Sequence, residues 1–170
     1  MSRPDPSEYN AYYGRYISLV PDGPIVDRLR EQIGETLGVL RALPESRGEH
    51  RYAPGKWSIK EIVGHVADAE RVFGYRTLRI ARGDETPLPG FEQDDYVRNG
   101  GFGARTLRHL LDELETVRRG TVLLLEGLDE SAMTRRGTAS GFPVSVRALA
   151  YITAGHERHH LNVLRERYLA

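Results

Sequence analysis

The sequence predicts an all-α fold, specifically a four-helix bundle. Four long stretches carry apolar side chains at the spacing of an α-helix, and the 170 residues contain no internal repeat or low-complexity segment. Helices that each have one apolar stripe bury these stripes against one another, and a bundle does this with short connections. Residues 1–170 are therefore expected to form one domain.

The N-terminal part of the chain is expected to hold an arm and the first bundle helix. Residues 1–21 are rich in proline and tyrosine, lack a clean apolar period and are expected to pack as an arm on the body. The first bundle helix is expected over residues 22–43, with Pro24 tolerated in its first turn. Gly34 and Gly38 weaken this helix and are attributed to close packing against a neighbouring helix.

The second bundle helix, residues 58–82, has the clearest start signal. Ser58-Ile59-Lys60-Glu61 is a capping box, in which Ser58 caps the helix and the side chain of Glu61 reaches back to it. The next segment, residues 83–103, is rich in glycine and proline and has no period of its own. Loops of this length are uncommon in a compact domain unless they cross over or build a site.

The third and fourth bundle helices are expected over residues 104–127 and 145–168. A turn through Gly141-Phe142-Pro143 separates them. The fourth helix holds His156, His159 and His160, three of the six histidines of the chain. It is the element around which we expect a functional site.

His156 and His160 are four residues apart, so on a helix they lie about one turn apart on one face. At about 100° per residue both fall within about 40° of the centre of the apolar stripe, whereas His159 lies about 100° away. Adjacent buried imidazoles leave polar nitrogens unsatisfied unless they share a partner. The pair therefore predicts two ligands of one metal ion.

His65 is the candidate for a third ligand. It lies about 85° from the centre of its own helical stripe, at the margin, whereas His109 lies about 140° from its stripe and is expected to be solvated. His50 falls in a loop. Antiparallel packing of helices two and four would bring His65 level with about residue 161 and parallel packing with about residue 152, so the antiparallel case fits the pair better. This requires an up-down-down-up order with a long crossover through residues 83–103.

Imidazole ligands suit Zn or Ni, with Fe, Mn or Cu as alternatives. Three protein ligands leave at least one position open for a substrate, as in catalytic sites. Glu157, Asp68 and Glu61 are candidates to accept the free N–H of a ligand imidazole, although a solvated helix face is the commoner role of any one such carboxylate. The alternative is that the three histidines are buried and satisfied by carboxylates or carbonyls.

His156-Glu157-Arg158-His159-His160 also matches the HExxH pattern of zinc peptidases. Val163 and Glu166 stand where the metzincin extension needs Gly and His, and ten residues follow His160. These departures disfavour a peptidase.

Composition excludes several classes of function. Lys+Arg and Asp+Glu are both 24, so no global field favours nucleic acid or an anionic membrane. Cysteine is absent, which excludes disulfides, Cys-ligated zinc, Fe–S clusters and a protein thiol nucleophile. The N-terminus has no apolar signal region and no run approaches the length of a membrane span. A cytoplasmic protein is expected.

Two motifs resemble the DinB/YfiT-like family of metalloenzymes. They are Gly55-Lys56-Trp57-Ser58-Ile59-Lys60-Glu61-Ile62-Val63-Gly64-His65-Val66-Ala67-Asp68-Ala69-Glu70 and His156-Glu157-Arg158-His159-His160-Leu161, and Leu88-Pro89-Gly90-Phe91-Glu92-Gln93-Asp94-Asp95 is similar to the middle segment of the family. The resemblance covers about residues 25–168. It implies an up-down-down-up bundle, a homodimer and a divalent metal on His65, His156 and His160. Members with assigned roles are similar to S-transferases that use bacillithiol or mycothiol, and to maleylpyruvate isomerase.

The expected function is therefore a metal-dependent enzyme that transfers a low-molecular-weight thiol to an electrophilic small molecule. A metal can hold a cosubstrate thiol as a thiolate near neutral pH. The alternative is a hydrolase that activates water at the same ion. A second alternative is a non-catalytic, stress-associated binding or dimerisation module. No nucleic-acid or membrane partner is expected.

Overall fold

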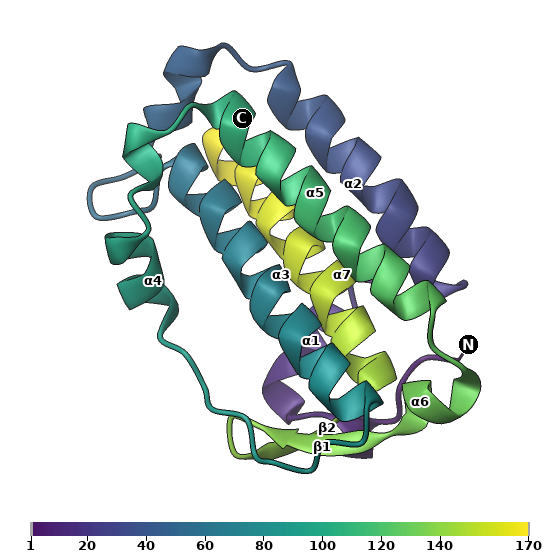
Figure 1. The fold of residues 1–170 in the computed structure, drawn as a ribbon. Helices are drawn as coiled ribbons and strands as arrows, with labels where there is room; N and C mark the ends of the chain where they lie inside the picture. Colours follow the sequence, from purple (N-terminus) through teal and green to yellow (C-terminus); the bar gives the residue numbers. More distant parts are fainter. Residues whose placement is uncertain (1, 170) are drawn as a thin grey trace.

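The computed structural model describes residues 2–169, and its body is a bundle of four long helices (Figure 1). These helices are α2 (Ile25–Arg41), α3 (Ile59–Ala81), α5 (Leu107–Glu126) and α7 (Val146–Val163), and a π-helical turn, Leu164–Tyr168, extends the last of them. α2 and α7 run in one direction and α3 and α5 in the other, which confirms the up-down-down-up order. α3 and α2 lie on one diagonal, and each packs against both α5 and α7.

Side-chain caps fix where the helices that carry the histidines begin. The Ser58 Oγ accepts from the Glu61 N–H at 3.2 Å and the Glu61 carboxylate accepts from the Ser58 N–H at 2.6 Å, so the predicted capping box is present at the start of α3. The Ser145 Oγ accepts from the Ala148 N–H at 3.0 Å at the start of α7. These caps satisfy N–H groups that have no partner inside the helix.

The connections between the helices hold more structure than the sequence suggested. The segment 83–103 contains α4 (Gln93–Asn99), and a 3-10 turn, Phe102–Ala104, begins at its end. A helix of two turns is too short to show a period, which is why none was expected there. No helix in the described part of the chain combines the length and the apolarity needed to cross a membrane.

The connection from α5 to α7 was expected to be a turn, but this prediction was incomplete because the segment also contains a helix and two strands. It holds α6 (Glu130–Thr134) and an antiparallel hairpin of β1 (Arg136–Ala139) and β2 (Phe142–Ser145), with Ala139 paired to Phe142. The two turn residues, Ser140 and Gly141, both have positive φ, at 54° and 81°. Two such residues match the right-handed twist of the flanking strands.

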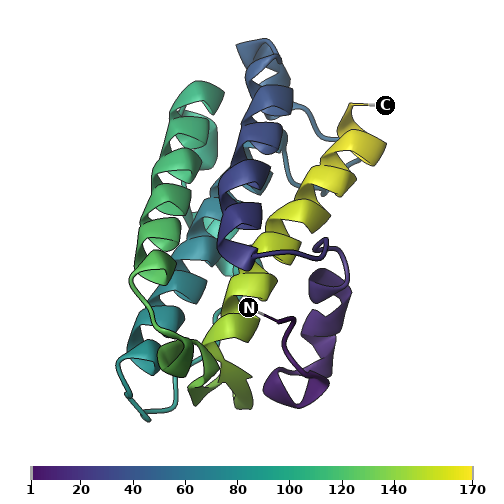
Figure 2. The ribbon, with the colours of Figure 1, turned by 90° about the vertical axis from the view of Figure 1, so that its right-hand side faces the viewer.

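The N-terminal arm packs on α7 (Figure 2). It consists of two 3-10 turns, Pro6–Glu8 and Ala11–Tyr13, and α1 (Gly14–Ile17). At Gly155 of α7 a Cβ would lie 2.1 Å from the Tyr16 carbonyl oxygen, so glycine is needed for this approach. Close packing was expected at Gly34 and Gly38 instead, and this was wrong because a Cβ at either would meet no atom within 4 Å.

Glu8 fixes the arm to the start of α7. Its carboxylate accepts from the Ser145 hydroxyl at 2.6 Å and from Arg147 Nε at 2.7 Å, and the whole residue is buried. Hydrogen bonding to Arg147, against the opposing effect of burial, lowers the pKa of Glu8 from its ordinary 4.5 to about 2. The negative charge of Glu8 therefore stabilises the folded state.

Glu8→Gln is expected to lower the free energy of unfolding at neutral pH by roughly 1.5–3 kcal/mol, as for hydrogen bonds to charged groups. Because folding lowers this pKa, the stabilisation is complete above about pH 4.5 and is lost as the pH falls towards 2. Urea unfolding measured across this pH range should show that acid lowers the free energy of unfolding less in the variant than in the wild type. The exposed Glu31→Gln serves as the control. If the free energy of unfolding changed equally with pH in the wild type and in Glu8→Gln, this role of Glu8 would be contradicted.

The apolar core is divided into two clusters by a layer of polar side chains. One cluster includes Leu29 of α2, Phe73 of α3 and Ala154 of α7, and the other includes Leu37 of α2 and Leu164 beyond α7. Between them lie the buried polar side chains of His65, Glu70, Gln32, Thr36, Arg118, His156 and Glu157. This polar layer contains the candidate site.

Candidate metal centre

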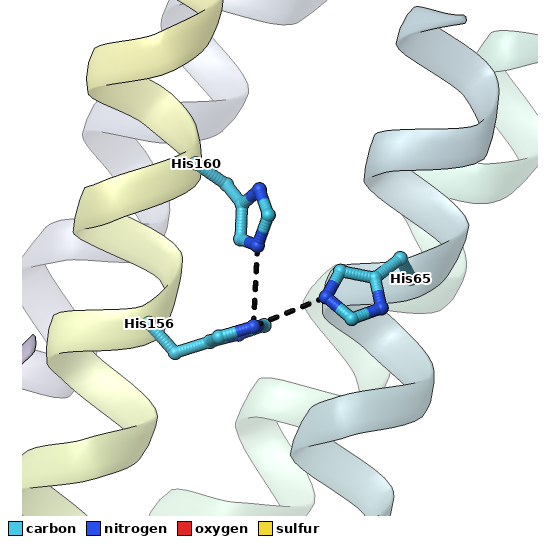
Figure 3. Close-up of side chains that lie close together, drawn as sticks. All are labelled: His65, His156 and His160. Carbon is cyan, nitrogen blue, oxygen red and sulfur yellow. Dashed lines mark hydrogen bonds between the residues drawn. The ribbon is translucent and has the colours of Figure 1, made fainter. Parts of the chain in front are cut away.

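Three imidazoles converge between α3 and α7 (Figure 3). His65 Nε2 lies 3.1 Å from His156 Nε2, and His160 Nε2 lies 3.2 Å from the same atom. Each of the three rings offers a nitrogen within 4.8 Å of the nitrogens of the other two. The antiparallel packing of α3 and α7 brings together the three histidines that the sequence singled out.

Burial keeps these imidazoles neutral. His65 is 2% exposed and burial lowers its pKa to about 4, while the charge of Asp94 acts in the opposite direction. Burial first, and then the charges of neighbouring histidines, hold the pKa values of His156 and His160 well below 6.5. A neutral imidazole has a free lone pair, which is the form that binds a metal.

The arrangement of the nitrogens fits a shared ion better than mutual hydrogen bonds. A ring nitrogen has one position in the ring plane, either an N–H or a lone pair, so His156 Nε2 cannot satisfy both neighbours. Nitrogens bound to one ion at about 2.0–2.1 Å lie about 2.8–3.4 Å apart for right-angled or tetrahedral geometry. The two measured separations fall in that range. His65 Nδ1 is buried and has no hydrogen-bond partner among the described residues.

Aromatic rings from three segments hold the imidazoles in place. The Trp57 ring lies 4.8 Å from the His65 ring, and the Tyr16 and Phe73 rings lie 5.4 Å and 5.7 Å from the His156 ring, measured between centroids. Such contacts restrict ring rotation and exclude water from these faces. Contacts within the protein therefore restrain the positions of the His65 and His156 rings.

Two cavities meet at the histidines. One, of about 280 Å³, is bordered by His160 together with Tyr52, Gly55, Lys56, Trp57, Ile62, Asp94, His159, Val163 and Tyr168. The other, of about 270 Å³, is bordered by His65 and His156 together with Tyr12, Tyr13, Tyr16, Phe73, Phe91, Glu92, Gln93 and Asp94. Asp94 of α4 borders both. A third cavity of about 420 Å³, beside Leu40 and Leu107, borders none of the histidines.

The structure does not bring the three expected carboxylates to the imidazoles. Glu61 completes the capping box and pairs with Arg51, and Asp68 pairs with Arg71. Glu157 is buried and directed towards α2 and α5, where it accepts from Gln32 and Thr36 and pairs with Arg118. None of the three has a hydrogen bond to a histidine in the described part of the chain.

The other three histidines lie at or near the positions predicted for them from the helical periodicity and the loop assignment. His109 is exposed and His50 lies in the loop before α3. His159 is partly buried with its ring 5.3 Å from Tyr16, and it borders one cavity without joining the three convergent nitrogens.

Sequence reasoning missed Asp94 and Tyr16 as site residues. Both lie in segments without a clear helical period, the crossover and the N-terminal arm, so no projection could orient them. The clustered tyrosines of the arm and the acidic run that begins α4 were the available signals.

Comparisons with known proteins agree with this fold. A family model described as the DinB superfamily matches residues 28–164. A protein of Oceanobacillus iheyensis named "Putative metal-dependent hydrolase" is 27% identical over 141 residues, which cover 80% of this chain and 77% of the relative. The solved structure of YfiT from Bacillus subtilis, described as "a probable metal-dependent hydrolase with an unusual four-helix bundle topology", aligns with a TM-score of 0.74. That alignment covers 97% of this chain and 90% of the other at 16% identity, and it shows the shared fold.

Proposed function

Because this chain belongs to the DinB superfamily, we propose that it is a metal-dependent enzyme whose ion is held by His65, His156 and His160. The convergence of three imidazoles, those of His65 and His156 buried and that of His160 partly buried, whose pKa values are all lowered, carries this proposal. Zn or Ni suits imidazole ligation best. A divalent ion bound there would act as a Lewis acid, lowering the pKa of a small nucleophile and leaving at least one position open for it.

The two cavities favour a reaction between two organic molecules. In hydrolysis the nucleophile is water, which occupies only about 30 Å³. Hydrolysis therefore needs a large cavity for only one organic substrate. Here one cavity of about 280 Å³ reaches the histidine cluster at His160, and another of about 270 Å³ reaches it at His65 and His156. We therefore place a low-molecular-weight thiol, such as bacillithiol or mycothiol, in one cavity and an electrophilic small molecule in the other. The new bond joins the thiol sulfur to the electrophilic carbon, and the leaving group departs from that carbon.

Asp94 is the residue best placed to take the proton of the thiol. It borders both cavities, and its charge reaches His65. A carboxylate at the boundary between two substrates can accept a proton from one and return it to the leaving group of the other. The aromatic rings of Tyr13, Phe73 and Phe91 would hold the apolar part of the electrophile.

Hydrolysis is the second candidate, favoured by the description of the Oceanobacillus and Bacillus proteins as metal-dependent hydrolases. Water would then replace the thiol as the nucleophile, and Asp94 would accept its proton. The residues that hold the ion would be the same.

One assay separates these candidates. The untagged protein is loaded with Zn²⁺ or Ni²⁺, and conjugation of monochlorobimane is followed with bacillithiol, mycothiol and cysteine beside hydrolysis of a panel of esters and amides. Thiol-dependent, metal-dependent conjugation is the expected result, and Asp94→Asn should lower kcat by about 10²-fold or more. Glu92→Gln, which changes a carboxylate bordering only one cavity, is the control.

Turnover of an ester or amide without any thiol would instead establish the hydrolase. A protein that binds metal but turns over none of these compounds would favour a non-catalytic binding module.

A further inference from the structure

A buried ion cluster joins all four bundle helices within the same polar layer as the histidines. Its charged members are Glu70 of α3, Arg118 of α5 and Glu157 of α7, whose side chains are only 1–2% exposed. None of them borders the two larger cavities that reach the histidines or enters the chemistry proposed above.

The Arg118 guanidinium binds both helices that carry the histidines. Its Nε and one terminal nitrogen donate to the two carboxylate oxygens of Glu70, each at 2.8 Å, which is the bidentate geometry of a strong pair. That terminal nitrogen also lies 2.7 Å from Glu157 Oε2. The other terminal nitrogen donates to the Leu29 carbonyl of α2 at 3.0 Å.

α2 completes the partners of Glu157. The Thr36 hydroxyl donates to one carboxylate oxygen at 2.5 Å, and the Gln32 amide donates to the other at 2.7 Å. The same Gln32 nitrogen donates to the Ala154 carbonyl of α7 at 2.9 Å, so α2 binds α7 through its backbone as well as through Glu157. Fully satisfied networks of this kind permit only one arrangement of their members.

Stability alone does not explain charges at this depth. Removing two carboxylates and a guanidinium from water is costly, and apolar side chains of the same volume often stabilise a core equally well. Directional bonds supply what apolar packing does not, namely a fixed rotation and register of the helices. Glu157 follows His156 directly, so the bonds that hold Glu157 also fix the direction in which His156 and His160 point.

We infer that Arg118 is a positioning residue for the metal centre. By binding Glu70 on α3 and Glu157 on α7, it sets the separation between His65 Nε2 and the two imidazoles of α7. This inference rests on the proposed function, because it assigns the histidines to one ion.

Co²⁺ in place of the native ion gives a test that does not need activity, because its visible absorption reports the coordination geometry. In Arg118→Met, the Co²⁺ affinity is expected to fall about 10–100-fold, the range found when groups that orient metal ligands are removed. The absorption spectrum should change with it. Arg118→Lys, which keeps the charge but loses the bidentate fork, should lie between Arg118→Met and the wild type.

A second variant covers the case in which Arg118→Met does not fold, since it leaves two buried carboxylates without a cation. The combination Glu70→Gln, Arg118→Met and Glu157→Gln removes every charge and keeps one of the two acceptor oxygens that Glu157 offers to Gln32 and Thr36. Leu125→Ala, a truncation on α5 in the apolar cluster that contains Phe73, is the control for lost stability. It should retain the wild-type affinity and spectrum.

The outcomes separate the two claims. A folded Arg118→Met or charge-free variant with wild-type Co²⁺ affinity and spectrum would overturn the positioning role while leaving the metal centre intact. A wild-type protein that binds neither Co²⁺ nor Zn²⁺ would remove the metal centre, and this inference with it. A spectral change in Leu125→Ala as large as that in Arg118→Met would also overturn the inference. A general loss of core packing would then be enough to explain the changed metal coordination.

Discussion

His156→Ala is expected to abolish stoichiometric Zn²⁺ binding and the activity that depends on it. His65 Nε2 and His160 Nε2 lie 3.1 and 3.2 Å from His156 Nε2. Loss of the His156 imidazole therefore removes the central one of the three proposed ligands. The loss of affinity should exceed the roughly 10–100-fold seen when only a group that supports a ligand is removed. Metal analysis after dialysis, together with isothermal titration, measures it directly.

The same variant has a distinctive effect on stability. Metal bound only by the folded state adds about 2.7 kcal/mol to the free energy of unfolding when its free concentration is 100 times the dissociation constant. Thermal unfolding of the wild type should therefore shift upwards with Zn²⁺, and that of His156→Ala should not. His109→Ala, at an exposed position of α5, should behave as the wild type. An equal zinc-induced shift in His156→Ala and the wild type would place the ion elsewhere.

The sequence predicted which way the histidines of the long helices point, because helical periodicity is strong where an element is long and half buried. The projections oriented His156 and His160 inwards and His109 outwards, as observed. The marginal position of His65, about 85° from the centre of its stripe, counted against it as a ligand. In the bundle α7 packs beside α3, so a residue at the margin of the α3 stripe can face α7. A residue at the margin of one helical stripe can therefore lie beside residues of the neighbouring helix, as His65 lies beside His156.

The ion cluster was not predicted from the sequence, although its charges lie on apolar stripes. Arg118 follows Leu114 by four residues and precedes Val122 by four, so it lies on the buried face of its helix. Glu70 stands in the same relation to Val66 of its own helix. Buried charges require partners, so two such residues of opposite sign predict an internal pair. The sequence could not show which atoms meet, because these residues lie 48 positions apart on different helices.

The carboxylates proposed as imidazole partners show the limit of proximity along the chain. Glu157 is adjacent to His156, but one residue corresponds to about 100° of rotation, which directs it towards α2 and α5 instead. Glu61 lies four residues before His65 and is used by the capping box. The acid that borders the cavities, Asp94, comes from α4 in the crossover.

Gly155→Ala is expected to displace the N-terminal arm from the bundle. The added Cβ would lie 2.1 Å from the carbonyl oxygen and 2.4 Å from the carbonyl carbon of Tyr16, and backbone cannot move aside as a side chain does. The free energy of unfolding should fall by about 1–3 kcal/mol or more, as for overpacked cores. Urea unfolding measures this loss, and limited proteolysis should cleave the arm faster than in the wild type.

Gly34→Ala is the matched control, because Gly34 also lies inside a bundle helix but a Cβ there would meet no atom within 4 Å. It should raise the free energy of unfolding by about 0.5–1 kcal/mol through the better helix propensity of alanine. Tyr16 packs on His156 and borders one of the two cavities, so displacement of the arm opens that cavity to water. Gly155→Ala should therefore raise KM for the electrophile, whereas Gly34→Ala should not. A Gly155→Ala protein as stable as Gly34→Ala, with the arm still protected, would show that α1 can move away from α7 at little cost.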